Sequence, residues 1–236
     1  MDGTDLHWYL SSSGPSSGGA KSATEIVSAT DNNVFADVSS SSRIAGGTEY
    51  RKIFLANEHA SDAYGPPSIW ISTDPSHCDG YIGLGFDDAD DADSATGILV
   101  AWSAGAKVSL ASDAADTRSV DIYGIVGTTP TKETVVLTGT SAVLSVATFA
   151  EVLGLHTTVS ASRTITIKQG SGGTTRGTIG IGAASCFLWL AAASKSTGLR
   201  LPALAASDSY GIWEKVTWSA AATAGAQDLP LATEAI

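Results

Sequence analysis

Apolar and polar side chains alternate along short stretches of the first third of the chain. Residues 49–57 (EYRKIFLAN) alternate between two faces, and residues 68–73 (SIWIST) combine β-branched and aromatic side chains after a Gly-Pro-Pro sequence. Period-two alternation and β-branched residues are typical of strands, and proline is tolerated where a strand begins. Together with residues 82–86, these stretches predict three neighbouring antiparallel strands.

The same pattern continues in the middle of the chain. Residues 119–126 (SVDIYGIV) and 133–138 (ETVVLT) alternate, and residues 127–132 (GTTPTK) between them contain glycine and proline. This arrangement predicts two antiparallel strands joined by a loop.

A second hairpin is the clearest structural prediction in the sequence. Residues 163–169 (RTITIKQ) alternate strictly, and residues 176–181 (RGTIGI) return after residues 170–174 (GSGGT). Glycines in the connecting segment can adopt positive φ without a steric penalty, as a tight hairpin tip requires.

Helical patterns are sparse. In residues 145–155 (SVATFAEVLGL), Val146, Phe149 and Leu153 are spaced by three and four, and Gly154 lies near the end, which predicts a short helix. Surrounding β-branched residues favour a strand there, so both alternatives stay open. The whole pattern predicts an all-β chain of two mostly antiparallel β-sandwich or Ig-like units, with few or no helices.

Two distant segments share one pattern. Residues 48–56 (TEYRKIFLA) and 209–219 (SYGIWEKVTWS) each place a tyrosine, a basic residue and large apolar residues on an alternating strand. This similarity indicates either duplicated sandwich strands or two strands of similar composition.

Composition changes along the chain suggest its domain organisation. Residues 11–22 (SSSGPSSGGAKS) are predicted to form a flexible linker, and residues 87–97 (DDADDADSATG) an acidic loop. We expect a first sandwich over residues 1–105 with a Ser/Gly-rich arm. A second sandwich is expected over residues 106–236, with its C-terminal strand packing back on the first.

Charge and hydropathy exclude several classes of protein. The 236 residues include 24 acidic and 13 basic side chains, for a net charge of −11. Nucleic-acid binding needs clustered lysine and arginine, so we expect no nucleic-acid partner. No apolar run approaches the length of a membrane span, and the acidic N-terminus does not resemble a signal peptide. We therefore expect synthesis in the cytoplasm and no contact with a membrane.

An acidic run is the most concentrated group of candidate ligands. It consists of Asp87, Asp88, Asp90, Asp91 and Asp93. Carboxylates on one loop can bind Ca²⁺, but the spacing of an EF-hand is missing and alanine alternates with the aspartates. We therefore predict a solvated loop in which like charges repel one another, with Ca²⁺ binding as the alternative.

Histidine and cysteine give no pattern of a metal site. The four histidines are His7, His59, His77 and His156, and the two cysteines are Cys78 and Cys186. None has the spacing of a zinc motif, and we expect no metal or cofactor. His7 is expected to be half-buried or at an interface, and His59 to make a turn contact. A buried free thiol is expected for Cys186 and an exposed one for Cys78, with a bridge between them as the alternative.

Catalytic motifs are also missing. Residues 80–85 (GYIGLG) lack the spacing and lysine of a phosphate loop, and residues 182–185 (GAAS) do not make a nucleophile elbow. A glycosidase needs two paired carboxylates, and nothing in the sequence pairs Glu133, Glu151 or Glu214. We predict that the protein is not an enzyme.

Tryptophan leaves two functions open. The six are Trp8, Trp70, Trp102, Trp189, Trp213 and Trp218. Exposed rings could stack on sugars, as in a carbohydrate-binding module or adhesin. Their apolar neighbours favour packing in a core or at a subunit interface instead.

Several segments resemble structural proteins of tailed-bacteriophage virions. Residues 5–10 (DLHWYL), followed by the Ser/Gly tract, and residues 49–57 with 69–71 are similar to strands of such proteins. Residues 120–139 and 164–177 resemble their Ig-like or β-sandwich modules. The likeness lies in composition and in the order of strands.

This resemblance implies a non-enzymatic virion component made in the host cytoplasm. A capsid decoration or cement protein that stabilises the head is the first expectation, and a tail, neck or baseplate subunit is the alternative. Decoration proteins are often symmetric homo-oligomers, especially trimers, that contact the major capsid protein through interlocked arms. In such a shell, Arg43, Arg51, Lys52 and Arg118 are expected at contacts with acidic neighbours.

Overall fold

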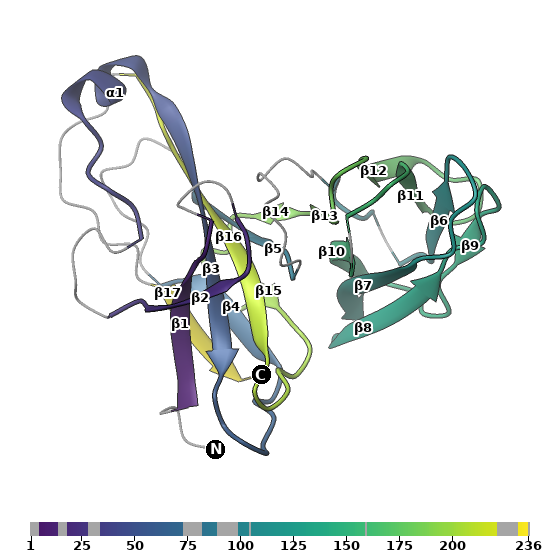
Figure 1. Ribbon diagram of the computed structural model, residues 1–236, viewed down its shortest axis with the longest axis horizontal. Helices are drawn as coiled ribbons and strands as arrows, with labels where there is room; N and C mark the ends of the chain where they lie inside the picture. Colours follow the sequence, from purple (N-terminus) through teal and green to yellow (C-terminus); the bar gives the residue numbers. More distant parts are fainter. Residues whose placement is uncertain are drawn as a thin grey trace.

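The protein folds into two β-sandwiches. The computed structural model describes residues 5–13, 18–27, 34–72, 82–88, 99–103, 105–158, 160–220 and 231–235. Figure 1 shows two lobes side by side, each built from antiparallel sheets. The predicted all-β class is confirmed.

The first sandwich contains the longest strands. Its large sheet has the order β14-β5-β16-β3-β1-β2, namely β14 (Trp189–Leu190), β5 (Ile82–Phe86), β16 (Ser209–Trp218), β3 (Gly47–Asn57), β1 (Leu6–Ser11) and β2 (Lys21–Glu25). Its small sheet consists of β15 (Leu199–Arg200), β4 (Pro67–Ile71) and β17 (Leu231–Ala235). One short helix, α1 (Ser40–Ala45), precedes β3, and the Ser39 side chain accepts a hydrogen bond from the Ser42 N–H at its start.

Alternate residues of the large sheet form the core of this sandwich. Ile53 and Leu55 of β3 and Ile212 of β16 pack against Ile69 and Ile71 of β4. All five side chains are buried. Removing this apolar surface from water stabilises the two-sheet arrangement.

The second sandwich pairs two four-stranded sheets. One consists of β13 (Ser185–Phe187), β10 (Glu151–Thr157), β7 (Ser119–Val126) and β8 (Thr129–Val136) in that order. The other consists of β12 (Thr175–Ile179), β11 (Ile165–Gln169), β6 (Val108–Ser112) and β9 (Val143–Leu144). Val120, Ile122 and Val152 of the first sheet meet Leu110 and Ile167 of the second in a buried core.

The chain leaves the first sandwich after β5 and returns to it at β14. Strands β14 and β5 are hydrogen-bonded neighbours, so the second sandwich lies between two adjacent strands of the first. Its core already includes Leu99 and Trp102, ahead of residue 106, and β14–β17 all pair within the first sandwich. The division into units of 1–105 and 106–236 stays a prediction. The pairings show that the segment that packs back on the first sandwich contains four strands, β14 to β17, rather than one.

The three strands predicted as neighbours do not pair with one another. Strand β3 lies between β1 and β16, β5 lies between β14 and β16, and β4 belongs to the opposite sheet. That prediction was wrong because periodicity reports which face of a strand is buried, not which strand lies beside it.

The two similar segments are partners in the sheet. Strands β3 and β16 pair antiparallel from Gly47 opposite Trp218 to Ala56 opposite Ser209. Both are central strands buried on two faces over much of their length, and this shared environment accounts for their similar composition. Duplication stays a prediction.

Of the other local predictions, some are confirmed and some are wrong. The hairpin of β11 and β12 is confirmed, with Ile165 opposite Ile179. The predicted loop at residues 127–132 is shorter, because Val126 already pairs with Thr129 and Gly127 turns the chain at a φ of 61°. Of the two alternatives for residues 145–155, the helix is wrong and the strand is confirmed for the second half, where β10 pairs with β7 and β13.

The Ser/Gly tract connects a hairpin rather than forming a free linker. Ser11 pairs with Lys21 in the β1–β2 ladder, and the Ser12 N–H donates to the Ala20 carbonyl. Both ends of the tract therefore lie in the large sheet; residues 14–17 lie outside the described residues.

Candidate functional site: an acid–base cluster where the two sandwiches meet

Aromatic rings join the outer face of the β7–β10 sheet to the end of β5. The Phe86 ring lies 4.6 Å from that of Tyr123 and 5.3 Å from that of Tyr210, both edge to face. A register shift in β10 between Val152 and Gly154 turns this part of the strand toward Phe86. The apolar core of the first sandwich thus continues into the second.

Two aspartates follow directly after Phe86, and the carboxylate of the first has both a charged partner and a neutral hydrogen-bond donor. Asp87 accepts hydrogen bonds from Lys52 Nζ at 3.1 Å and from Trp213 Nε1 at 2.8 Å. The side chains of Lys52 and Asp87 are both inaccessible to solvent. An ion pair buried in this way is tolerated because its charges and hydrogen bonds are satisfied together.

Asp88 contacts the second sandwich directly. Its Oδ2 accepts a hydrogen bond from the Tyr123 hydroxyl at 2.8 Å. Burial raises the pKa of Asp88 to about 7, against the lowering effect of the Tyr123 hydrogen bond. The nearby charge of Asp208 raises it further. The carboxyl of Asp88 therefore binds and releases a proton near neutral pH.

His156 completes the cluster from β10. The residue is 8% exposed, and neither ring nitrogen has a hydrogen-bond partner among the described residues. Its Nε2 lies 3.5 Å from Asp121 Oδ2 and 3.8 Å from Asp88 Oδ2. Burial lowers the pKa of His156, so the neutral imidazole is favoured.

Asp121 already has closer partners. Lys132 Nζ lies 3.0 Å from its Oδ2, and the Thr134 hydroxyl donates to its Oδ1 at 2.5 Å. The cluster therefore contains a carboxyl, that of Asp88, and an imidazole, that of His156, whose pKa values burial shifts toward the neutral form of each. Within the described ranges, no three His, Cys, Asp or Glu side chains are arranged to hold a metal ion.

The acidic run was predicted as a solvated loop, and this is wrong for its first two members. Asp87 is buried against Lys52 and Trp213, and Asp88 is largely buried against Tyr123. Both continue β5, so the sheet carries them into the junction. Asp90, Asp91 and Asp93 lie outside the described residues.

The other histidines and the cysteines have local surroundings. His59 makes the predicted turn contact, accepting at Nδ1 from the Asp62 N–H at 2.9 Å. His7 is partly exposed and its Nδ1 lies 2.6 Å from Glu25 Oε1. Cys186 is a buried free thiol, as predicted, and burial raises its pKa to about 12. His77 and Cys78 lie outside the described residues.

The three glutamates considered for a glycosidase have different local roles. Glu133 accepts from the backbone N–H groups of Val146 and Ala147, at 2.5 and 2.9 Å. Burial raises the pKa of Glu214, on the core face of β16, to about 8.

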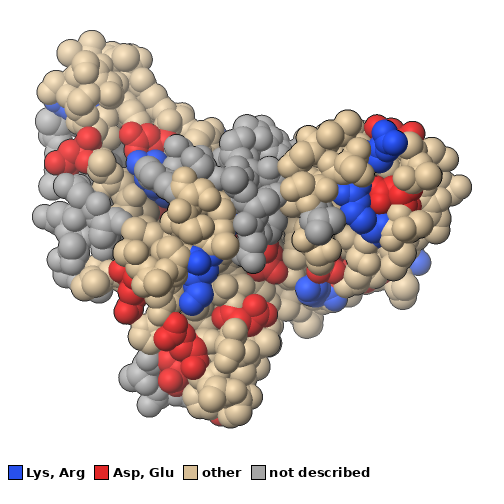
Figure 2. All heavy atoms as spheres, in the orientation of Figure 1, with Lys and Arg blue, Asp and Glu red and all other residues tan. Residues whose placement is uncertain are grey.

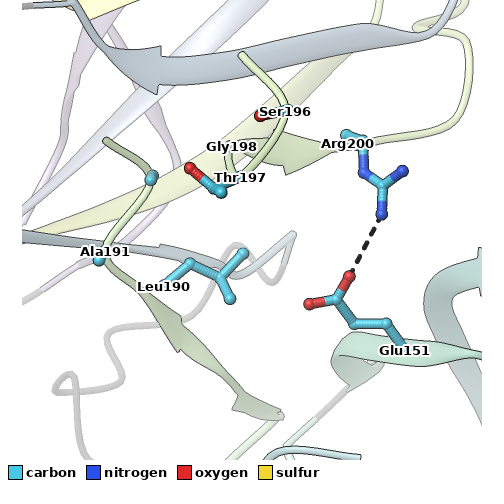
Figure 3. Close-up of a pocket in the computed structure, with 8 residues that line it drawn as sticks. Glu151, Leu190, Ala191, Ser196, Thr197, Gly198 and Arg200 are labelled. Atoms are coloured by element: carbon cyan, nitrogen blue, oxygen red, sulfur yellow. Dashed lines mark hydrogen bonds and ion pairs between the residues drawn. The ribbon is translucent and has the colours of Figure 1, made fainter. Parts of the chain in front are cut away.

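Glu151 forms a second bridge between the sandwiches. It lies 3.4 Å from Arg200 Nη2 across a hollow of about 320 Å³ (Figure 3). Two hydroxyls that line this hollow, those of Ser196 and Thr197, bond to Ser194 within their own turn. The lining therefore offers few polar groups to a ligand.

The glycine-containing segments considered for phosphate binding or catalysis are structural. Residues 82–85 of the first segment belong to β5, and residues 80 and 81 lie outside the described residues. In the second segment, Gly182 turns the chain at a φ of 85° and Ser185 is buried in β13.

Tryptophan packs inward. Trp102, Trp213 and Trp218 are buried, and Trp8, Trp70 and Trp189 are half-buried. The Trp189 ring contacts Tyr50 and Phe187. None of the six presents a fully exposed ring.

Three of the four basic residues expected at acidic neighbours are engaged inside the chain. Lys52 is buried with Asp87, which corrects its predicted place at a contact surface. Arg51 pairs with Glu49, and Arg118 pairs with Asp116, whose pKa its hydrogen bonds lower. Arg43 lies in the last turn of α1.

Tyr123 and Asp121 were missed as functional residues, and Trp213 was considered only for sugar stacking or for packing. The alternation of residues 119–126 places Asp121 and Tyr123 on one face, which was a usable signal for a polar contact. Nothing in the sequence indicated that this face meets the end of β5.

Comparison with protein-family models, with curated proteins and with solved structures found no match. No helix among the described residues is long and apolar enough to cross a membrane.

Proposed function

We propose that the protein is a non-enzymatic structural component of a tailed-phage virion, and specifically a decoration or cement protein of the capsid head. The segments that resemble virion proteins support this, because they form strands in both sandwiches. In particular, residues 6–10 and 53–57 are directly paired in the large sheet.

The observation that carries the proposal is an apolar group on the second sandwich. Val136, Leu144 and Val146 are 54, 39 and 84% exposed, and they lie on β8, on β9 and just after β9, where these edge strands lie beside each other. Glu133 fixes the backbone at Val146. Exposed apolar side chains held in a rigid position are typical of a surface that is covered by another protein.

The rest of the surface suits assembly. On the face shown in Figure 2, charged side chains form separate small groups on a surface of mainly uncharged residues. We propose a symmetric homo-oligomer, most simply a trimer, that contacts the major capsid protein in the virion. A tail, neck or baseplate subunit is the alternative within the same class. The inward packing of the tryptophans favours both over a carbohydrate-binding module or adhesin.

Purified particles provide the direct test. Mass spectrometry should detect the chain in phage particles, and cryo-electron microscopy should place it on the head. Density on the tail would favour the alternative, whereas absence from purified particles would overturn the proposal. A glycan array separates the other class, since specific sugar binding lost on substitution of Trp8, Trp70 or Trp189 by alanine would indicate an adhesin.

A matched pair of variants tests the apolar group. Val146→Asp should reduce incorporation into particles, because it charges the exposed apolar surface. Ser171→Asp, at the exposed tip of the β11–β12 hairpin of the same sandwich, should be incorporated normally. Equal incorporation of both variants would remove the apolar group as the contact surface.

A further inference from the structure

We propose that Asp88 and His156 form a proton latch between the two sandwiches, in which one proton lies on Asp88 when they are docked and passes to His156 when water reaches them. The inference is independent of the proposed virion role, because it concerns only how the two sandwiches hold together.

Among the described residues, both lysines near the junction are paired with carboxylates other than that of Asp88. Lys52 is 3.1 Å from Asp87, and Lys132 is 3.0 Å from Asp121. Each lysine therefore has a carboxylate in direct contact. The described partner of the Asp88 carboxyl is the neutral Tyr123 hydroxyl, at 2.8 Å. A charged Asp88 would add an uncompensated negative charge to the junction.

The position of His156 agrees with a neutral ring. An imidazolium that paired with a carboxylate would hold it at about 2.7–2.9 Å. Its Nε2 instead lies 3.5 Å from Asp121 and 3.8 Å from Asp88. Both separations are too long for the charge-assisted hydrogen bonds that would compensate a buried positive charge.

Charged and titratable groups face this pair from every element packed around it. They are Lys52 of β3, Asp87 just after β5, Asp121 and Tyr123 of β7, Lys132 of β8, Asp208 just before β16 and Tyr210 within it. Asp208 and Asp87 raise the pKa of Asp88, whereas Lys132 lowers it. Asp121 and Asp87 raise the pKa of His156, whereas Lys132 and Lys52 lower it, and the burial of each group is a larger effect than any of these charges. Tyr210 stays protonated, because burial raises its pKa.

The latch relocates a proton rather than releasing it. In the docked state the O–H bond is on Asp88 and the imidazole is neutral. In water at pH 5–6 a carboxyl is ionised and an imidazole is protonated. Separation therefore breaks the O–H bond of Asp88 and forms an N–H bond on His156, with no net exchange with solvent. The same relocation accompanies unfolding, so these two groups together add little pH dependence to stability in this range.

Single variants should expose two opposite slopes. In His156→Gln only Asp88 exchanges a proton, so the unfolding constant should rise with pH between 5 and 7. In Asp88→Asn only His156 does, so the constant should fall over the same range. Relative to the control, the unfolding constant of each variant should change by up to about tenfold per pH unit, because unfolding then takes up or releases one proton.

The control is Asp113→Asn, at an exposed position of the second sandwich. Urea unfolding followed by tryptophan fluorescence, from pH 5 to pH 8, gives the unfolding constants. Any pH dependence that all variants share cancels when the constant of each variant is divided by that of the control. Slopes of the same sign in the two variants, or slopes equal to the control, would overturn the latch.

A measurement on the unchanged protein keeps the proposal testable if a variant does not fold. Nitrogen-15 NMR of the histidine rings at pH 6 should show the two ring nitrogens of His156 with the shifts of a neutral imidazole. Infrared difference spectra between unlabelled protein and protein with carbon-13-labelled aspartate should contain, at this pH, the shifted stretching band of a protonated buried aspartic acid, which separates Asp88 from the protonated Glu214. A protonated His156 at pH 6 would overturn the proposal.

Discussion

The α-carbon of Gly154 in β10 faces the carbonyl oxygen of Phe86 in β5 so closely that a Cβ on Gly154 would lie 2.8 Å from that oxygen. Phe86 belongs to the first sandwich and Gly154 to the second, so the docking of the two depends on the absence of a side chain here. The neighbouring Phe187 Cβ, at 3.4 Å from the same point, closes the other side.

Gly154→Ala should therefore weaken the docking. The added methyl group must displace backbone rather than a flexible side chain, and overpacking of this kind costs about 1–3 kcal/mol. Urea unfolding should show the loss. Gly180→Ala is the control, because a Cβ there has no neighbour within 4 Å and φ is ordinary. The control should be neutral or more stable by up to about 1 kcal/mol. Equal stability of the two variants would contradict the close approach.

Lys52→Met should be strongly destabilising. It removes the only ammonium group in contact with the buried Asp87 carboxylate among the described residues. Breaking a buried pair on one side costs about 3–5 kcal/mol, because a charge stays buried without compensation. Adding Asp87→Asn should recover part of the loss, since the asparagine oxygen can still accept from Trp213 Nε1.

Lys195→Met serves as the matched control for this prediction. Lys195 pairs with Glu234 at 2.9 Å, and their side chains are 42 and 62% exposed. Exposed pairs contribute about 0–1 kcal/mol. The contrast between the two lysines should appear in the free energy of unfolding, and a loss for Lys52→Met as small as that for Lys195→Met would show that Asp87 is not charged.

The sequence predicted the class of the fold but not the arrangement of its strands. Alternation over residues 163–181 was sufficient for the β11–β12 hairpin, because both strands and the turn are local. The pairing of β3 with β16 joins segments more than 150 residues apart, and no local pattern reports such a contact. For the same reason β10 resembled a helix: buried on both faces, it lacks the alternation of a half-exposed strand.

The contact between the two sandwiches could not be predicted from the sequence, because it too joins residues that are far apart along the chain. Asp87 and Asp88 looked like the start of a solvated acidic loop because aspartates follow them in the sequence. Their burial depends on Lys52, Tyr123 and Trp213, which arrive from three other strands. Only the assembled sheets show that the first two aspartates of the acidic run, Asp87 and Asp88, lie inside the protein.

Glu133→Ala should release the segment around Val146. Its carboxylate accepts from two consecutive backbone N–H groups, those of Val146 and Ala147. Losing these bonds costs about 1–3 kcal/mol locally, and amide hydrogen exchange at both positions should accelerate by about tenfold or more. Thr129→Ala, at an exposed position of the same strand, should leave that exchange unchanged. Unchanged exchange in Glu133→Ala would mean that other contacts hold the segment.

Glu214→Gln should change the pH dependence of stability. The side chain lies in the core of the first sandwich, its Oε2 has no hydrogen-bond partner among the described residues, and burial raises its pKa from 4.5 to about 8. A raised pKa in the folded state means that the folded protein binds the proton more tightly than the unfolded chain. The contribution of Glu214 to stability is therefore full below pH 4.5 and is lost as pH rises to about 8, by up to ~1.4 kcal/mol per pH unit.

Glutamine keeps the shape of the protonated acid and cannot ionise, so the variant should lack this loss. Its stability relative to the unchanged protein should rise steadily between pH 5 and pH 8, measured by urea unfolding at each pH. Glu234→Gln, at an exposed position of β17, should follow the unchanged protein throughout. If Glu214→Gln had the same pH dependence as the unchanged protein, the Glu214 carboxyl would ionise in the folded core at its ordinary pKa. That would require a cation nearer to it than Arg51, whose charge already lowers its pKa.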